Sequence, residues 1–284
     1  KLVIVEGIPG SGKTSTARFA AGRLAQPLAR HGVSVRLHLE GDLDHPADYE
    51  STACLSAAGY AALRAAFPVW SAELDRLAVR RGEEVMLSYR RLDAPPAELF
   101  AALASQDVYE LPLDDWQRVT LARWEEFSRA AGQGGDAYVF ECCLLQNLLT
   151  TPLARFDQPA ARAAAHLLRA AGAISALRPA LIYLDPPSVR AALEKAAAER
   201  PREWLDFVCA YTCGQVWGAA RGLSGFEGLV RFYETRRALE KSLIPALAAL
   251  GFDVLWLDNA GLDWNADHAR VDAFLAPRFD LPCG

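Results

Sequence analysis

The residues best suited to chemistry form a glycine-rich segment close to the start of the chain, Gly7-Ile8-Pro9-Gly10-Ser11-Gly12-Lys13-Thr14. It matches the pattern G-x-x-x-x-G-K-[ST], in which the backbone curls so that several N–H groups point at one phosphate. Lys13 is expected to reach the β- and γ-phosphates of a nucleoside triphosphate, and the Thr14 hydroxyl to bind Mg²⁺. The predicted nucleotide-binding residues are Gly7, Pro9, Gly10, Ser11, Gly12, Lys13, Thr14 and Ser15.

The segments on either side of this loop support the same interpretation. The apolar run Leu2–Val5 precedes the loop, and a helix-compatible stretch, Ser15–Ala29, follows it. A helix that starts directly after the loop would add the positive end of its dipole to the phosphate site. The pattern therefore predicts a strand, a phosphate-binding loop and a helix in that order.

Composition limits the classes of partner. The chain has 284 residues, 52% of them hydrophobic, and a formal net charge of −5. An acidic balance argues against nucleic acid, whose phosphate backbone calls for a basic face. No apolar run reaches the ~18 residues that a membrane span needs, and no secretory signal is recognisable, so we expect a cytoplasmic protein without a membrane partner. The six cysteines match the spacing of neither a zinc site nor a disulfide framework.

Five short, nearly continuous apolar segments are typical of strands covered on both faces. Helical segments separate them, which favours an α/β fold with a doubly wound parallel sheet of five strands flanked by helices. We expect a single domain over residues 1–284. The predicted strands are Leu2–Glu6, Ser34–Leu39, Ala137–Glu141, Ala180–Leu184 and Asp253–Leu257.

Two further regions are expected to shape the site. A long, mostly helical insertion at about 47–135 separates the second and third strands and carries several aromatic residues, and Glu84–Tyr89 within it is either a short strand or part of a lid. A lid region is expected at about 188–237. Insertions of this kind usually form a substrate pocket, although the aromatic residues also suit an ordinary hydrophobic core.

Acidic residues follow the second and third strands, at the edge of the sheet where ligands bind in such folds. Glu40 is the first choice for a general base that accepts the proton of an attacking hydroxyl, and Asp42 is the second. Asp44 and Asp48 are expected to orient substrate or to face solvent. Glu141 ends the third strand in a Walker B arrangement, and its carboxylate is expected to hold Mg²⁺ directly or through water.

Basic residues follow the fourth strand. Arg200 and Arg202 are the candidates for a lid that folds over the phosphates and stabilises charge in the transition state. The planar guanidinium suits this role because it grips two oxygens at once. Beyond the fifth strand, Asn259 lies in a loop that often wraps the nucleotide base in such folds, while the Asn-Lys-x-Asp guanine selector is absent. ATP and GTP therefore both stay open as the nucleotide.

Taken together, these motifs resemble the P-loop kinases of small molecules, in particular the thymidylate kinase and deoxynucleoside kinase group. The resemblance rests on Glu6 through Thr14, Glu40, Glu141 and the segment Ile182–Pro187. It implies a P-loop NTPase fold and gives Glu40 the place of the general base. In deoxynucleoside kinases an arginine follows the acid of the third strand, and here Cys142 stands there instead. The plan is also similar to chloramphenicol phosphotransferase.

The sequence thus predicts a Mg²⁺-dependent phosphotransferase that moves the γ-phosphate of ATP or GTP to a hydroxyl of a small molecule. The acceptor is expected to be nucleoside-like or antibiotic-like, as in self-resistance or specialised metabolism. The alternatives are a regulatory NTPase with water as acceptor and a nucleotide-binding module without catalysis. The sequence leaves the oligomeric state open, with a homodimer as one option.

Overall fold

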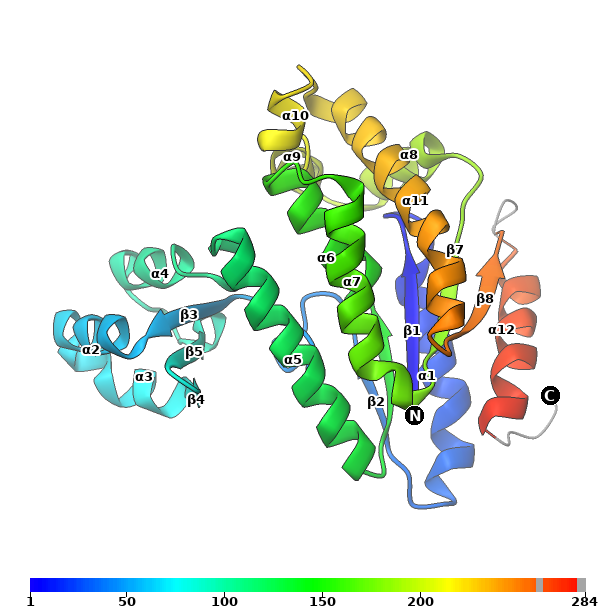
Figure 1. The fold of residues 1–284 in the computed structure, drawn as a ribbon, viewed down its shortest axis with the longest axis horizontal. Coiled ribbons are helices and arrows are strands. Elements are labelled where there is room, and N and C mark those ends of the chain that lie inside the picture. Colours follow the sequence, from blue (N-terminus) through cyan, green and yellow to red (C-terminus); the bar gives the residue numbers. More distant parts are fainter. Residues whose placement is uncertain (259–262, 280–284) are drawn as a thin grey trace. The chain divides into compact units, whose positions relative to one another are not determined.

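The computed structural model describes residues 1–258 and 263–279, and its centre is a five-stranded parallel sheet (Figure 1). The strands lie in the order β2-β6-β1-β7-β8, and all four pairings are parallel. The predicted α/β class and five-stranded parallel sheet flanked by helices are confirmed. The strands are β1 (Leu2–Gly7), β2 (Val35–His38), β6 (Ala137–Glu141), β7 (Ala180–Leu184) and β8 (Asp253–Leu257).

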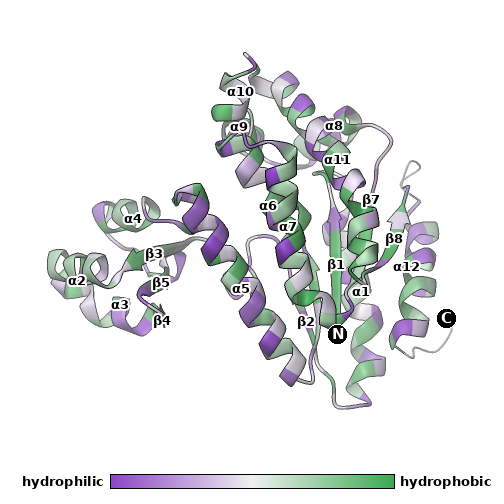
Figure 2. Cartoon of the chain, in the orientation of Figure 1, coloured by the Kyte–Doolittle hydropathy of each residue, from purple (hydrophilic) through white to green (hydrophobic). Residues whose placement is uncertain are grey.

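One face of this sheet is covered by helices α1 (Lys13–Ala29) and α12 (Trp264–Phe279). Alternate residues of a strand point to opposite faces, so Val3 and Val5 of β1 both turn toward these helices. There they share one buried cluster with Leu24 of α1 and Leu275 of α12. Figure 2 shows hydrophobic colour along β1 and mixed colour on the surrounding helices.

The opposite face is covered by four helices, which contact the remaining side chains of the strands. Phe140 of β6 lies with its ring centroid 6.3 Å from that of Trp124 and 4.8 Å from that of Phe127. Helices on both faces explain why each strand is an almost unbroken apolar run. The four helices are α5 (Leu113–Gln133), α6 (Leu145–Thr150), α7 (Ala160–Ile174) and α11 (Gly225–Ala249).

The region between β7 and α11 covers most of the segment, at about 188–237, for which a lid is predicted. Three helices fill it: α8 (Val189–Glu199), α9 (Arg202–Tyr211) and α10 (Val216–Ala219). Ser188 caps α8 by accepting the Ala191 N–H at 3.2 Å. The cap sets the point at which the chain leaves the sheet edge and turns into α8.

The chain divides into two compact units, one of Lys1–Glu40 with Trp124–Gly284 and one of Gly41–Arg123. The second unit has its own core, which includes Leu55, Leu74 and Val85. It contains an antiparallel sheet in the order β3-β5-β4, which the expectation of a mostly helical segment did not include. Its elements are β3 (Thr52–Ser56), α2 (Ala57–Ala66), α3 (Ser71–Leu77), β4 (Ala78–Arg81), β5 (Glu84–Ser88), α4 (Ala97–Ala104) and the first part of α5.

The strand alternative for Glu84–Tyr89 is the one observed, as β5. A short apolar run is compatible with a buried strand and with a helix segment. Periodicity alone therefore did not identify β3 and β4 as strands.

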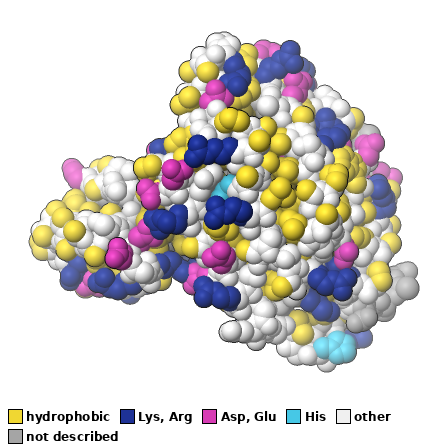
Figure 3. Space-filling model, in the orientation of Figure 1, with side chains coloured by type: hydrophobic (Ala, Val, Ile, Leu, Met, Phe, Trp, Pro, Cys, Tyr) yellow, Lys and Arg dark blue, Asp and Glu magenta, His cyan; other side chains and the backbone are white. Residues whose placement is uncertain are grey.

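Two surface properties bear on possible partners. None of the described helices is both long and apolar enough to cross a bilayer. Acidic and basic side chains are interspersed over the face shown in Figure 3.

Candidate functional site

The Gly7–Thr14 loop lies at the carboxyl edge of the parallel sheet. It follows β1, which pairs with β6 on one side and with β7 on the other, and it leads directly into α1 at Lys13. From β1 the chain continues to β2 on one side of the sheet, and from β7 to β8 on the other. Where the connections that follow two neighbouring strands run to opposite sides of the sheet, a crevice forms, and α/β proteins bind ligands in this crevice.

The curve of this loop depends on two glycines with positive φ. Gly10 has φ +81, and a Cβ there would lie 2.0 Å from the Ala192 carbonyl oxygen of α8. Gly12 has φ +91, and its Cβ would lie 2.0 Å from the ring of Trp264. Both positions therefore need glycine for conformation and for space. The loop is packed between α8 and the start of α12.

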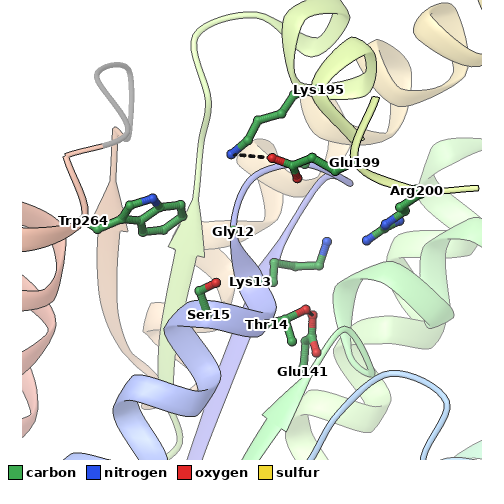
Figure 4. A pocket seen from close by; sticks show the side chains of 10 residues that line it. Gly12, Lys13, Thr14, Ser15, Glu141, Lys195, Glu199, Arg200 and Trp264 are labelled. Carbon is green, nitrogen blue, oxygen red and sulfur yellow. Dashed lines mark hydrogen bonds and ion pairs between the residues drawn. The ribbon is translucent and has the colours of Figure 1, made fainter. Parts of the chain in front are cut away.

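A cavity of about 330 Å³ opens over this loop (Figure 4). It collects residues from β6, α1, α8 and α12, which are distant in sequence. Among the predicted site residues, Gly10, Gly12, Lys13, Thr14, Ser15, Glu141 and Arg200 all line it, together with Lys195, Glu199 and Trp264. Gly7, Pro9 and Ser11 belong to the loop but are not among the lining residues.

Lys13 is buried, and its ammonium donates to the carbonyl oxygen of Ile8 at 3.0 Å. The Ser11 N–H donates to the same oxygen at 3.2 Å. The lysine therefore closes the loop on itself while its charge stays at the cavity. A phosphate oxygen is a stronger acceptor for this ammonium than a neutral carbonyl, because it carries negative charge itself.

Thr14 and Glu141 form a pair of oxygen groups at the floor of the cavity. The Thr14 hydroxyl donates to Glu141 Oε1 at 2.6 Å, and the Glu141 side chain is buried at the end of β6. A hydroxyl and a carboxylate beside a phosphate-binding loop are the kind of donor set that Mg²⁺ takes, with water and phosphate oxygens completing the shell. These two residues fit the predicted metal role.

Glu40 and Asp42, the two candidates for a general base, fall in different compact units. Glu40 is exposed just beyond β2 and accepts from the Gln146 amide at 2.7 Å. Its carboxylate lies within 4.8 Å of a Glu141 oxygen. Asp42 belongs to the second unit, where its carboxylate accepts the Asp44 N–H at 2.9 Å within a turn. Only Glu40 is thus placed beside another predicted site residue within one unit.

The other two acids of this segment, Asp44 and Asp48, have partners inside the second unit. Asp44 forms an ion pair with Arg91, and Asp48 accepts from the Tyr109 hydroxyl at 2.5 Å. Both contacts are structural.

The two candidate lid arginines differ in position. Arg200 lines the cavity with its guanidinium directed toward Lys13 (Figure 4), and it also lies 4.4 Å from the centre of the Trp204 ring. Arg202, the first residue of α9, is exposed and is not among the lining residues. Arg190 is held by Glu227 through two hydrogen bonds of 2.9 and 2.6 Å.

Sequence reasoning missed three lining residues as site residues, namely Lys195, Glu199 and Trp264. The Lys195 ammonium lies 5.6 Å from the centre of the Trp264 ring and 3.9 Å from Glu199. The rarity of lysine in this chain was a usable signal for Lys195, whereas nothing in the local pattern marked Trp264. The predicted base-contacting residue Asn259 lies outside the described residues.

Glu6, at the end of β1, is a buried carboxylate that ties the loop strand to α6. Its oxygens accept the backbone N–H groups of Leu144, Leu145 and Gln146 at 2.7, 2.8 and 3.2 Å. Burial, with the nearby charge of Glu240, raises the pKa of Glu6 to about 7, although the N–H donors act in the opposite direction. The site thus contains an acid that titrates close to neutrality.

Below the loop lies a fully buried ion pair between Arg236 and Glu240 of α11, with Arg236 Nε 2.8 Å from Glu240 Oε1. Arg236 also donates to the Thr150 hydroxyl at 3.0 Å and to the Gly7 carbonyl at 3.4 Å. The Tyr183 hydroxyl donates to Glu240 at 2.9 Å. This network connects α11 and β7 to the first residue of the loop.

The assembled site has a loop whose backbone suits an anion, three cationic side chains (Lys13, Lys195 and Arg200) and a hydroxyl–carboxylate pair that suits a divalent cation. No family model matches this chain, and no curated protein matches it at a significant level of sequence similarity.

Proposed function

We propose that this protein is a Mg²⁺-dependent phosphotransferase of the P-loop NTPase fold, which transfers the γ-phosphate of ATP or GTP to a hydroxyl of a small molecule. One observation carries the proposal. The glycine-rich loop, the ammonium of Lys13 and the Thr14–Glu141 pair line one cavity at the switch point of a parallel sheet. Positive charge and a Mg²⁺ site around a triphosphate are what phosphoryl transfer needs, because its catalysis is mainly positioning and charge stabilisation.

The triphosphate would bind along the loop, with its oxygens on backbone N–H groups and on the start of α1. Lys13 would exchange the Ile8 carbonyl for a phosphate oxygen. Thr14 and Glu141 would hold Mg²⁺, whose chemistry is to neutralise charge on the β- and γ-phosphates. Lys195 and Arg200 approach the cavity from the lid segment and would add charge stabilisation as the phosphoryl group moves.

Glu40 would accept the proton of the attacking hydroxyl. Its carboxylate stays exposed, is oriented by the Gln146 amide and lies near Glu141. A general base must lie within hydrogen-bonding reach of the proton it takes. Asp42 stays the second candidate for this role.

The acceptor would be a nucleoside-like or antibiotic-like alcohol, in line with the resemblance to thymidylate kinase, deoxynucleoside kinase and chloramphenicol phosphotransferase. This part of the proposal rests on the resemblance at the level of the fold and not on the residues of an acceptor pocket. Proteins of one fold can act on many different acceptors.

An acceptor screen tests the proposal. γ-Labelled ATP or GTP with Mg²⁺ would be incubated with nucleosides, nucleoside monophosphates, aminoglycosides and phenicols, and the products read by mass spectrometry. We expect a phosphorylated product that Lys13→Ala abolishes and that Glu40→Gln slows by about 10²–10⁴-fold. Asp42→Asn is the matched comparison and is expected to retain activity. Release of free phosphate alone, unchanged by any acceptor, would instead support an NTPase.

A further inference from the structure

Three side chains at the ends of β2 and β6 bring metal-binding atoms together, and one of them, Cys142, has no part in the proposed transfer of phosphate. Single oxygen or sulfur atoms of Glu40, Glu141 and Cys142 all lie within 4.8 Å of one another. The group contains two carboxylates and one thiol. Acidic clusters are common, so the thiol is the component that needs an explanation.

Cys142 is an unusual residue for its position. Its side chain is 1% exposed and is not in a disulfide. Its backbone N–H donates to the Val5 carbonyl at 3.1 Å, whereas its thiol makes no hydrogen bond among those found for the described residues. Its backbone has φ +65, the left-handed region that residues other than glycine, asparagine and aspartate rarely adopt. A buried thiol without a hydrogen bond among those found thus lies close to two carboxylates.

The ligand chemistry favours a metal softer than Mg²⁺. Mg²⁺ takes oxygen ligands, whereas Zn²⁺ takes thiolate and carboxylate together, usually in tetrahedral geometry. With bonds of about 2.0–2.3 Å, tetrahedral ligand atoms are about 3.5 Å apart. The cluster would have to contract by about 1 Å, and Glu40 can supply that movement because its side chain is exposed just beyond β2.

We propose that Glu40, Glu141 and Cys142 form a binding site for Zn²⁺ or another thiophilic divalent cation. Three protein ligands leave the fourth position for water. The Cys142 thiol loses its proton to solvent as the sulfur–metal bond forms, and no atom changes oxidation state.

The proposed site overlaps the catalytic groups. A thiophilic metal bound there would take Glu40 as ligand and so remove the general base, and it would take Glu141 from Mg²⁺. Zn²⁺ is therefore expected to inhibit phosphoryl transfer, a consequence that rests on the proposed function. Metal binding itself does not depend on that function, which keeps the two proposals separable.

A spectroscopic titration tests the site without any assay of activity. Co²⁺ is the probe, because a cobalt–thiolate bond gives a charge-transfer absorption band that oxygen ligands do not give. We expect one equivalent of Co²⁺ to produce the band in the wild type, and added Zn²⁺ to remove it. Cys142→Ser should lose the band, while the matched variant Cys143→Ser, at the adjacent buried thiol, should keep it.

Glu40→Gln provides a second variant, chosen because an exposed side chain can be changed without loss of folding. It should weaken Co²⁺ binding at least tenfold, since a neutral amide is a poorer ligand than a carboxylate. Absence of the band in the wild type would overturn the proposal. A band that survives in Cys142→Ser, or that depends on Cys143, would overturn it as well.

Discussion

The buried Arg236–Glu240 pair provides the sharpest test of how the site is supported. Both side chains are 0% exposed, and their closest atoms are 2.8 Å apart. At an effective dielectric constant of about 20, this distance corresponds to an attraction of about 6 kcal/mol. Desolvation of two charges offsets much of that, so the pair need not stabilise the protein relative to apolar residues. Removal of one partner alone leaves the other charge buried and unpaired, which costs about 3–5 kcal/mol.

A double-mutant cycle separates these effects. Arg236→Met and Glu240→Gln should each lower the free energy of unfolding by about 3–5 kcal/mol. The double variant should lose less stability than the sum of the two single losses, and the difference, the coupling energy, should be at least about 2 kcal/mol, because neither charge is then buried without its partner. Gln keeps an oxygen that can accept from the Tyr183 hydroxyl. Arg231→Met is the control, since this arginine lies on the same helix but is 70% exposed.

The assay is urea unfolding followed by circular dichroism and by tryptophan fluorescence, with the free energy of unfolding taken where both probes agree. Because Arg236 also donates to the Gly7 carbonyl, nucleotide affinity in the folded Arg236→Met variant should fall as well. The reasoning would be refuted if the double variant lost as much free energy of unfolding as the two single variants together. It would also be refuted if Arg231→Met were as unstable as Arg236→Met.

Three further predictions concern the loop and its surroundings. Burial raises the pKa of Glu6 from 4.5 in the unfolded chain to about 7 in the folded protein. Between these two pH values the unfolded chain releases the proton of Glu6 more readily than the folded protein does, so the free energy of unfolding of the wild type should fall by about 3 kcal/mol relative to Glu6→Gln as the pH rises. Urea unfolding of both proteins at about pH 5 and about pH 8 measures this. A difference in free energy of unfolding between wild type and Glu6→Gln that is the same at both pH values would contradict it. Gly10→Ala should weaken triphosphate binding at least tenfold, since its Cβ would meet the Ala192 carbonyl at 2.0 Å. Gly22→Ala, in the following helix and with nothing within 4 Å of its Cβ, should retain affinity. Trp264→Leu should weaken binding of ATP or GTP but not of inorganic tripolyphosphate, since the indole lines the cavity and offers an aromatic face on which a base would stack. Equal losses for both ligands would count against that role.

The parallel sheet was predictable because burial on both faces demands apolar strands. Ala137–Glu141, Ala180–Leu184 and Asp253–Leu257 have the predicted bounds, and Leu2–Gly7 extends the prediction by one residue. The loop was predictable for a related reason: left-handed backbone at Gly10 and Gly12 restricts the residue type, and such restrictions are visible in a sequence.

Contacts between distant segments were not predictable in the same way. Trp264 and Lys195 reach the cavity through the packing of α12 and α8, and neither local pattern records where a helix will pack. Strands β3 and β4 of the second unit were not predicted because apolar runs as short as Ala53–Leu55 suit either secondary structure. The buried role of Glu6 was also hidden, since its partners are backbone N–H groups of a segment some 140 residues away.

The most direct test of the account is whether the loop binds a nucleoside triphosphate. Isothermal titration of the wild type with ATP and with GTP, each with Mg²⁺, should show one site per chain for at least one of them. Lys13→Ala should weaken that binding at least tenfold while its circular dichroism spectrum stays unchanged, because the lysine lines the cavity and its ammonium would contact the phosphates of a bound nucleotide. A folded wild-type protein that binds neither nucleotide, or a Lys13→Ala variant that binds as tightly as the wild type, would contradict the account.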